Sequence, residues 1–222
     1  MNVERLRVGQ GEMANTYLVA LPEGGCFIVD FAVEDGNKTQ EYCLARFGFL
    51  SAVLLTHGHY DHIRGLKGFN PKPPTRVVLH QEEEEFLTNP RLNASYDLFR
   101  APFIVEDPLP FYLCEDEDEI VLGHRDESGF HGTVAKVIHT PFHTQGSVCY
   151  YFEEEGVLFS GDTLFRGGIG RYDLPGACPR KMEESLRKLM ALPPETKVYP
   201  GHGPSSTIGE ELRYNPSFLA LK

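Results

Sequence analysis

Apolar residues in the first half of the chain fall into short runs separated by turn-forming residues. The runs Asn15–Leu21 and Cys26–Phe31 flank the segment Pro22–Gly25, a pattern typical of a β-hairpin. Ala52–Thr56 is a nearly continuous apolar run, as expected for a strand that is buried on both faces. Arg76–His80 has the same character, so we expect a sheet of short strands in this half.

Helices are expected between and after these strands. Thr39–Phe47 is followed by a glycine, a residue that commonly ends helices, and Asp61–Gly68 and Gln81–Leu87 are shorter candidates. Pro179–Leu192 begins with a proline, which suits the first position of a helix. Four of its apolar residues share one helical face and predict core packing: Met182, Leu186, Leu189 and Met190.

The second half predicts more strands. Thr133–His139 alternates in polarity, Ser147–Phe152 and Gly156–Ser160 predict a second hairpin, and Lys197–Tyr199 predicts a last short strand. Asn89–Glu119 contains several prolines, and we expect it to be a long irregular excursion bordering the functional site. No linker divides the chain, so we expect one domain over residues 1–222, with helices packed on sheets in layers.

Composition narrows the possible partners. The formal net charge is −11, without any run of Lys or Arg, which argues against nucleic acid. No apolar run is long enough to span a membrane and no secretory signal is evident, so we expect a cytoplasmic location without a membrane partner. Five dispersed cysteines predict reduced thiols. We interpret Glu82–Glu85 as a solvated helix face and Glu115–Glu119 as a solvated turn.

The segment Thr56–His62 carries the strongest chemical signal. Its sequence is Thr-His-Gly-His-Tyr-Asp-His, which places three imidazoles and one carboxylate within six positions. Such groups together suit zinc, iron or manganese. In an extended segment His57 and His59 point the same way and can hold one ion. The chain then turns into a helix, which lets Asp61 and His62 face a second ion.

One segment cannot complete two coordination spheres, so further ligands must come from elsewhere in the chain. Three candidates, each at a strand-to-loop junction with glycines nearby, are His143, Asp162 and His202.

These motifs, in this order, resemble those of the metallo-β-lactamase fold superfamily over nearly the whole chain. The resemblance implies an α+β fold, a four-layer αββα sandwich with a metal site at one edge of its two sheets. It also implies two divalent metal ions, with zinc favoured and iron or manganese as alternatives. By this resemblance the first metal is bound by His57, His59 and His143, the second by Asp61, His62 and His202, and Asp162 bridges them.

Within the superfamily, the chain looks most like the short, single-domain glyoxalase II-like hydrolases. True β-lactamases lack an aspartate at the position of Asp162, whereas Leu164–Gly176 and Tyr199–Glu210 match the glyoxalase II-like pattern. The resemblance implies hydrolysis of an acyl thioester such as a hydroxyacylglutathione by a metal-bridging hydroxide. Asp61 would be catalytic, orienting the nucleophile, and Arg171 would bind the substrate. The C-terminal helical domain with which full-length glyoxalase II helps to bind glutathione is expected to be absent.

Several alternatives stay open. A persulfide dioxygenase of the same superfamily would hold one iron with His57, His143 and Asp162, and a metal-binding module would show little turnover. Arg171 has a structural alternative, namely pairing with Asp173. Phe142 stands where the family usually has glycine, and a bulky ring there is expected to narrow the site or to change access to it. Two further residues are expected to play supporting roles: Tyr60 in packing, and His139 in hydrogen bonding at a strand end.

Overall fold

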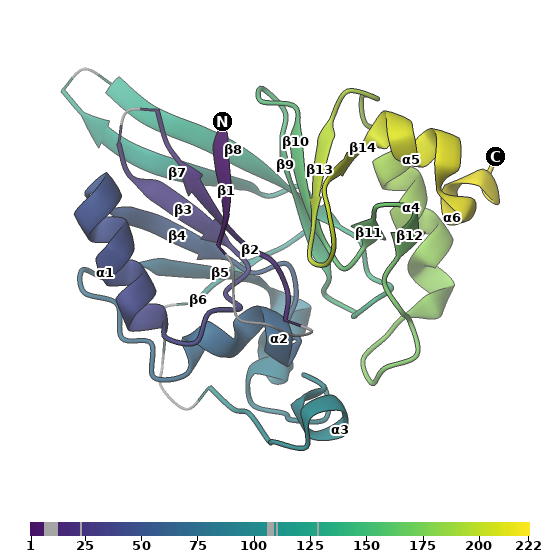
Figure 1. Cartoon of the computed structure of the whole chain (residues 1–222), viewed down its shortest axis with the longest axis horizontal. Helices are drawn as coiled ribbons and strands as arrows, with labels where there is room; N and C mark the ends of the chain where they lie inside the picture. The colour runs from purple at the N-terminus through teal and green to yellow at the C-terminus, as the bar shows by residue number, and fades with distance from the viewer. Residues whose placement is uncertain (7–12, 23, 106–108, 110, 128) are drawn as a thin grey trace.

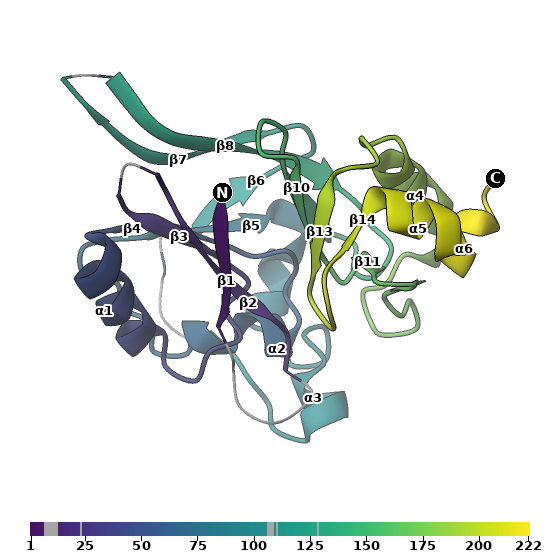
Figure 2. The same cartoon turned by 45° about the horizontal axis from the view of Figure 1, so that its top comes forward.

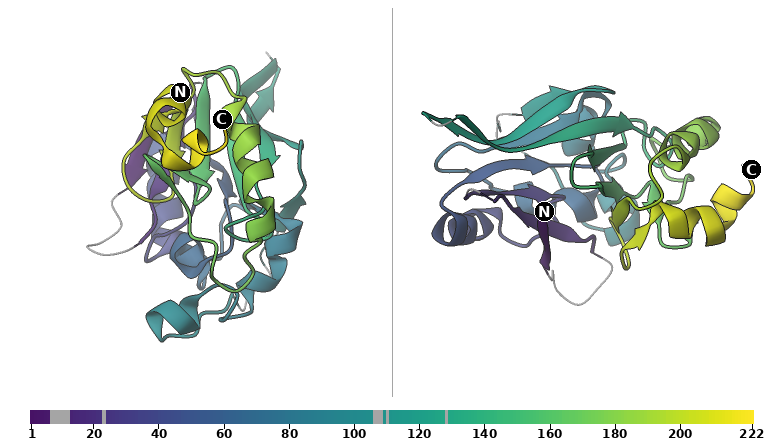
Figure 3. Two further views of the ribbon diagram at one scale, coloured as in Figure 1. Left: turned by 90° about the vertical axis from the view of Figure 1, so that its right-hand side faces the viewer. Right: turned by 90° about the horizontal axis from the view of Figure 1, so that it is seen from above.

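The pattern of apolar runs corresponds to two sheets packed face to face. The computed structural model describes residues 1–6, 13–22, 24–105, 109, 111–127 and 129–222 (Figure 1). Helices cover the outer face of each sheet, which gives four layers in the order α, β, β, α (Figure 3). This is the αββα sandwich implied by the sequence motifs.

The first sheet has the strand order β1-β2-β3-β4-β5-β6, antiparallel from β1 to β3 and parallel from β3 to β6. Its strands are β1 (Asn2–Leu6), β2 (Thr16–Ala20), β3 (Cys26–Val29), β4 (Leu50–Leu54), β5 (Arg76–His80) and β6 (Phe111–Cys114). The central strands are apolar at consecutive positions because both faces are buried. Tyr17 and Val19 face the second sheet, whereas Leu18 faces the helices outside.

The second sheet has the order β14-β13-β10-β9-β8-β7. Its strands are β7 (Glu119–Asp126), β8 (Gly129–His139), β9 (Val148–Phe152), β10 (Val157–Gly161), β13 (Lys197–Pro200) and β14 (Ser206–Thr207). The short strands β11 (Leu164–Phe165) and β12 (Gly168–Ile169) form a separate pair. As Figure 2 shows, the long hairpin of β7 and β8 extends beyond the rest of its sheet.

The helices divide between the two outer layers. On the side of the first sheet are α1 (Gly36–Phe47), α2 (Tyr60–Ile63), α3 (Ser95–Phe99) and the 3₁₀ helices η1 (Arg64–Leu66) and η2 (Gln81–Leu87). On the side of the second sheet are the 3₁₀ helix η3 (Pro179–Lys181), α4 (Met182–Met190), α5 (Ile208–Tyr214) and α6 (Pro216–Leu219). Within the described residues, none of these helices combines the length and apolar character needed to cross a membrane.

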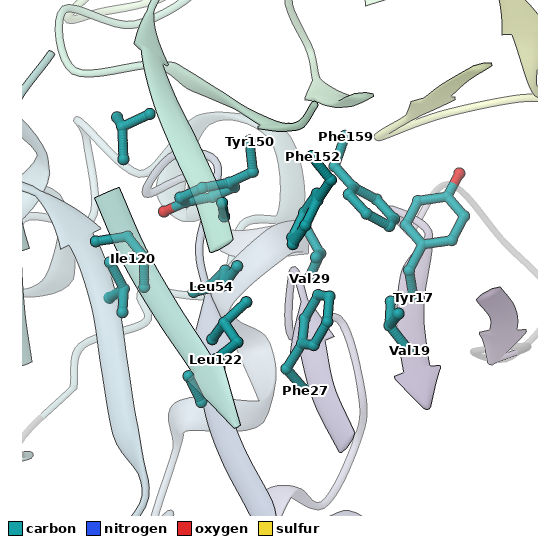
Figure 4. Close-up of a cluster of buried hydrophobic side chains, with 14 of the residues drawn as sticks. Tyr17, Val19, Phe27, Val29, Leu54, Ile120, Leu122, Tyr150, Phe152 and Phe159 are labelled. Carbon is teal, nitrogen blue, oxygen red and sulfur yellow. The ribbon is translucent and has the colours of Figure 1, made fainter. Parts of the chain in front are cut away.

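Aromatic residues fill the space between the sheets (Figure 4). Phe27 of the first sheet stacks on Phe152 of the second, with ring centroids 5.2 Å apart and an interplanar angle of 17°. Phe152 in turn meets Phe159 edge to face at 5.7 Å. The buried Tyr150 hydroxyl donates a hydrogen bond of 2.9 Å to the Leu55 carbonyl, which ties the second sheet to the end of β4. These contacts fix how the sheets lie against each other.

Strand direction brings the candidate ligands to one edge of the sandwich. In the first sheet β3, β4 and β5 run parallel, so their carboxyl ends lie together. In the second sheet β8, β10 and β13 share one direction, because each of β8 and β10 is antiparallel to β9 and β13 is parallel to β10. The Val148 amide donates to the Thr56 carbonyl across the two sheets at 2.9 Å, so the two sets of strand ends meet.

Local structure departs from the sequence prediction in several places. Helix α1 begins at Gly36 rather than Thr39 because the Asp35 side chain caps it, accepting a bond from the Lys38 amide at 3.0 Å. The predicted helix Asp61–Gly68 is divided into α2 and η1 and ends at Leu66. The prediction that Asn89–Glu119 is irregular throughout was wrong, since it contains α3 and β6.

Within that excursion, residues 106–108 and 110 lie outside the described residues, as does residue 23 of the first predicted turn. The expected strands and the helix at Pro179–Leu192 are otherwise present with small shifts of their ends. The sequence pattern did not predict β1, β7 or the helices after His202. All five cysteines are free thiols, as expected.

The stacking between the sheets can be tested by truncating Phe27. Phe27→Ala removes a completely buried ring, so we expect the free energy of unfolding to fall by about 3–5 kcal/mol in denaturant titrations. Phe130→Ala is the control, because this phenylalanine on β8 is 40% exposed and its loss should change stability by no more than about 0.5 kcal/mol. Equal effects of the two substitutions would contradict the role given to the aromatic stack.

Candidate metal centre

The His-rich segment lies where β4 ends and α2 begins. The chain bends at Thr56, after β4, and His59 is the extended residue that precedes α2. The imidazoles of His57 and His59 are almost completely buried, with 1% and 4% of each residue exposed. The predicted change from extended chain to helix within this segment is therefore confirmed.

Three imidazoles converge on one point, which we call the first metal position. Nε2 of His57 lies 3.0 Å from Nδ1 of His59, and this atom lies 2.9 Å from Nε2 of His143. His143 follows β8 and reaches the cluster from the opposite sheet. Nitrogens of three separate rings this close together form a ligand set for one cation.

A second group lies beside the first, and we call it the second metal position. Nε2 of His202 is 3.1 Å from Oδ2 of Asp61. Nε2 of His62 is 3.8 Å from the same carboxylate oxygen. These three residues form a second possible ligand set.

Asp162 lies between the two positions. Its Oδ2 is 3.6 Å from Nε2 of His143 and 3.6 Å from Nε2 of His202, while its Oδ1 is 3.3 Å from Nε2 of His62. One carboxylate thus reaches ligands of both positions, which is the placement expected for a bridging aspartate. All seven candidate ligands predicted from the sequence are brought together.

Unpaired buried atoms show that the site fits metal ions. Nε2 of His62 and Oδ1 of Asp162 are buried 3.3 Å apart, and among the described residues neither makes a hydrogen bond of good geometry. Burying such atoms without a partner is costly, and a coordinated cation would satisfy both. Zinc, iron and manganese all accept such a mixture of nitrogen and oxygen donors, so the donor types do not select one of the three metals.

Burial and neighbouring charges also set the protonation states of the ligands. Burial lowers the pKa of His57 well below its usual value and that of His59 to about 3, so both imidazoles are neutral near pH 7. Burial alone would raise the pKa of Asp162, but the neighbouring His62 outweighs it and the carboxyl is ionised. Lone pairs on neutral imidazole and on carboxylate are the forms that bind metal.

Asp30, which sequence reasoning missed, orients two of the histidines. Its Oδ2 accepts a bond of 2.8 Å from Nδ1 of His62, which leaves Nε2 of that ring facing Asp162. Its Oδ1 accepts from the Thr56 amide at 2.8 Å and hydroxyl at 2.9 Å. The Thr56 oxygen lies 3.1 Å from Nδ1 of His57, so that nitrogen carries the proton and Nε2 faces the first position. A lone acid in the apolar run Cys26–Phe31 was the available signal.

Close packing around Asp162 explains two glycines. A Cβ on Gly201 would come within 2.2 Å of Oδ1 of Asp162, and one on Gly170 within 1.9 Å of its carbonyl oxygen. Larger residues at either place would displace the bridging carboxylate, so the glycines near the ligands allow close approach, as expected.

Arg171 supports the site through its backbone. Its carbonyl accepts a bond of 2.6 Å from Nδ1 of His143, which fixes the ring that faces the first position. Its guanidinium forms two bonds to the Asp173 carboxylate, at 2.7 and 2.9 Å. The structural alternative for this side chain is therefore observed, and binding of substrate by Arg171 stays a prediction.

Two bulky neighbours pack away from the ligands. Phe142 is completely buried in the hydrophobic cluster beneath α4, α5 and α6, so it belongs to the core and not to the mouth of the site, contrary to expectation. Tyr60 packs against Phe99 and Phe103 with ring centroids 5.0 Å away in both cases, as expected for a packing residue.

A third cluster contains His80, Glu82 and His139, whose possible ligand atoms also lie close together. The two rings are stacked with centroids 4.1 Å apart and an angle of 19°, so their in-plane lone pairs cannot point at one ion without reorientation. Nε2 of His139 lies 2.9 Å from the Gln145 carbonyl. The expectation of strand-end hydrogen bonding for His139 is confirmed.

Comparison with known proteins agrees with this geometry. Residues 9–202 match the family model described as the metallo-beta-lactamase superfamily. The chain belongs to that superfamily. The α+β sandwich predicted from the motifs is thereby confirmed.

Two relatives within the superfamily bear on the chemistry. The Bacillus subtilis protein named "Probable metallo-hydrolase YqgX" is 36% identical over 217 residues, which cover 97% of each chain. The hydroxyacylglutathione hydrolase GloC of Haemophilus influenzae is 34% identical over 174 residues, covering 78% of this chain and 77% of the relative. The chain is thus a metallo-hydrolase of the superfamily.

Two solved structures of the superfamily share this fold, although they are described differently. The structure of BLEG-1, described as a B3 metallo-beta-lactamase, has a TM-score of 0.84 and 33% identity, covering 98% of this chain and 99% of the other. TTHA1623, solved in a di-iron-bound form, has a TM-score of 0.77 and 34% identity, covering 97% of this chain and all of the other (100%).

The bridging placement of Asp162 can be tested by metal analysis. Asp162→Ala removes a carboxylate that reaches ligands of both positions, so we expect the metal content per chain to fall by at least half and hydrolytic activity to be lost with it. Asp97→Ala, at an exposed carboxylate on α3, should leave both unchanged. Full activity with unchanged metal content in Asp162→Ala would refute the assignment.

Proposed function

We propose that this metallo-hydrolase cleaves an acyl thioester, such as a hydroxyacylglutathione, with two divalent metal ions, of which zinc is the first candidate. The observation that carries the proposal is the position of Asp162 between two complete ligand sets. The name of the relative GloC supports the choice of substrate class.

The cations, when bound, would lower the pKa of a water molecule and stabilise negative charge on the attacked carbonyl. We assign the handling of the proton to Asp61. Burial would raise the pKa of this carboxyl, but His62 and the hydrogen bond from His202 outweigh burial and lower it. An ionised Asp61 can accept a hydrogen bond from a nucleophilic water and orient it toward the acyl carbon.

Departure of the thiolate leaving group needs no general acid from the protein. A thiol has a pKa of about 8.5, so a thiolate leaves without a strong general acid beside it. This fits a centre in which His57 and His59 are neutral and the carboxylate of Asp162 is ionised. We therefore assign no protein acid to the step.

Binding of the substrate is assigned in part to Arg171. Its side chain is 52% exposed and its guanidinium pairs with Asp173, and a substrate carboxylate would replace that partner. His143 connects this residue to the centre, because its ring donates to the Arg171 carbonyl. The substrate carboxylate and the reacting carbonyl would then lie on the same side of the site.

The proposal predicts metal-dependent thioesterase activity. Purified protein should contain two metal ions per chain and hydrolyse lactoylglutathione, and dialysis against a chelator should remove both metal and activity. Re-addition of zinc, iron or manganese should restore activity, and the metal that restores it at stoichiometric amounts identifies the native one. The measurements are elemental analysis and thioester absorbance.

Other substrates give the control and the contrary outcomes. A panel of lactone, β-lactam and phosphodiester compounds should be cleaved more slowly than the thioester. One iron per chain with oxygen uptake on a persulfide would establish the dioxygenase alternative instead. Metal-dependent turnover of none of these compounds would favour a metal-binding module.

A further inference from the structure

One of the four consecutive glutamates at positions 82–85 is completely buried. Glu82, Glu84 and Glu85 are exposed, whereas Glu83 has no accessible surface. The segment forms the 3₁₀ helix η2, in which residues three apart share a face, and Phe86 is the buried partner of Glu83. The interpretation of the whole run as a solvated helix face was therefore wrong for this one residue.

The buried carboxylate connects two backbone segments that carry metal ligands. Oε2 of Glu83 accepts a bond of 2.7 Å from the Gly58 amide, and Oε1 accepts one of 2.7 Å from the Gly146 amide. Gly58 stands between the ligands His57 and His59, and Gly146 lies three residues after the ligand His143. Each oxygen thus holds one of the two loops that build the first metal position.

Both loops need glycine for this approach. A Cβ on Gly146 would lie 2.7 Å from Cγ of Glu83, and one on Gly58 would lie 2.5 Å from Cβ of Phe86 and 3.1 Å from Oε2 of Glu83. The two glycines are therefore a second, steric sign of the same contact. We call this contact the Glu83 clamp: Glu83, Gly58 and Gly146.

We propose that Glu83 is a positioning residue that sets metal affinity at the first position by holding the His57–His59 segment and the loop after His143 with one carboxylate. The proposal rests on the metal centre of the proposed function but not on its substrate. The two hydrogen bonds of the clamp reach loops of the first position, so its loss should affect that position selectively. In the second position His62 is held by Asp30 and not by the clamp.

The test is a cobalt titration of the metal-depleted full-length protein, followed by absorption spectroscopy without any substrate. Bands that remain in His202→Ala and disappear in His59→Ala report the first position. In Glu83→Gln an amide donor faces one of the two backbone amides, so we expect cobalt affinity at the first position to fall by about 10- to 100-fold. Affinity at the second position should change by less than about threefold.

Matched variants separate the clamp from general damage. Glu84→Gln makes the same chemical change on the exposed side of the same helix and should bind cobalt as the unaltered protein does. Gly146→Ala keeps the Glu83 carboxylate but places a methyl group too close to it. It should therefore also lower the cobalt affinity of the first position. Gly168→Ala, where a Cβ meets nothing within 4 Å, is its control.

Each outcome of the cobalt titration either supports or overturns the role of the Glu83 clamp. Selective weakening in both Glu83→Gln and Gly146→Ala supports the clamp, and Gly146→Ala decides the matter alone if Glu83→Gln does not fold. First-position affinity within twofold of the unaltered protein, or an equal loss at both positions, would overturn it. Binding of cobalt is measured without turnover, so an error in the proposed substrate would leave this result intact.

Discussion

Burial of the ligand side chains is the constraint on which the rest of the structure depends. Nδ1 of His59 lies about 3 Å from Nε2 of His57 and from Nε2 of His143, and all three rings are buried at the edge where the two sheets meet. Polar atoms in such a place are costly unless they are paired, and mutual repulsion would open a flexible site. The aromatic stack between the sheets and the strand ends at one edge hold the rings where a cation can bind them.

Much of this centre could be predicted from sequence because four of its seven ligands stand in one short segment. Their spacing alone indicates two facing directions, since an extended pair is followed by a helical pair. The distant ligands His143, Asp162 and His202 carry no such local signal beyond their neighbouring glycines. Their order along the chain and its resemblance to a known family supplied what spacing could not.

Elements that depend on tertiary pairing were harder to predict. Strand β6 has two exposed apolar residues, Tyr112 and Leu113, and is formed because it pairs with β5, not because its own pattern demands a strand. Strand β1 is likewise an edge strand with polar residues such as Asn2 and Glu4. Helix α5 did have a local signal, since Thr207 and Glu210 form a capping box, but the ending was interpreted only as a family motif.

Asp30 and Glu83 were missed for a different reason. An acid at a strand end or within an acidic run is ordinarily solvated, and only the folded chain shows that each is buried against a ligand loop. They also act differently: Asp30 selects which ring nitrogen of His62 faces the centre, whereas Glu83 fixes backbone. Composition and periodicity report what a residue is and which face it shares, but not which distant amide will approach it.

The ligands differ in solvent exposure across the centre, and this difference indicates from which side a substrate can approach. The imidazoles of the first position are at most 4% exposed, whereas the side chains of Asp61 and His202 are 15% and 34% exposed. A substrate must therefore approach over the second position, where Phe165 lies near His202 with ring centroids 6.0 Å apart. This geometry would separate two tasks, because the deep position offers buried neutral rings to a cation and the outer position is open to a substrate. Substitutions near His202 and Phe165 should then change substrate preference. Substitutions of the buried residues that support His57 and His143 should instead change how tightly metal is held.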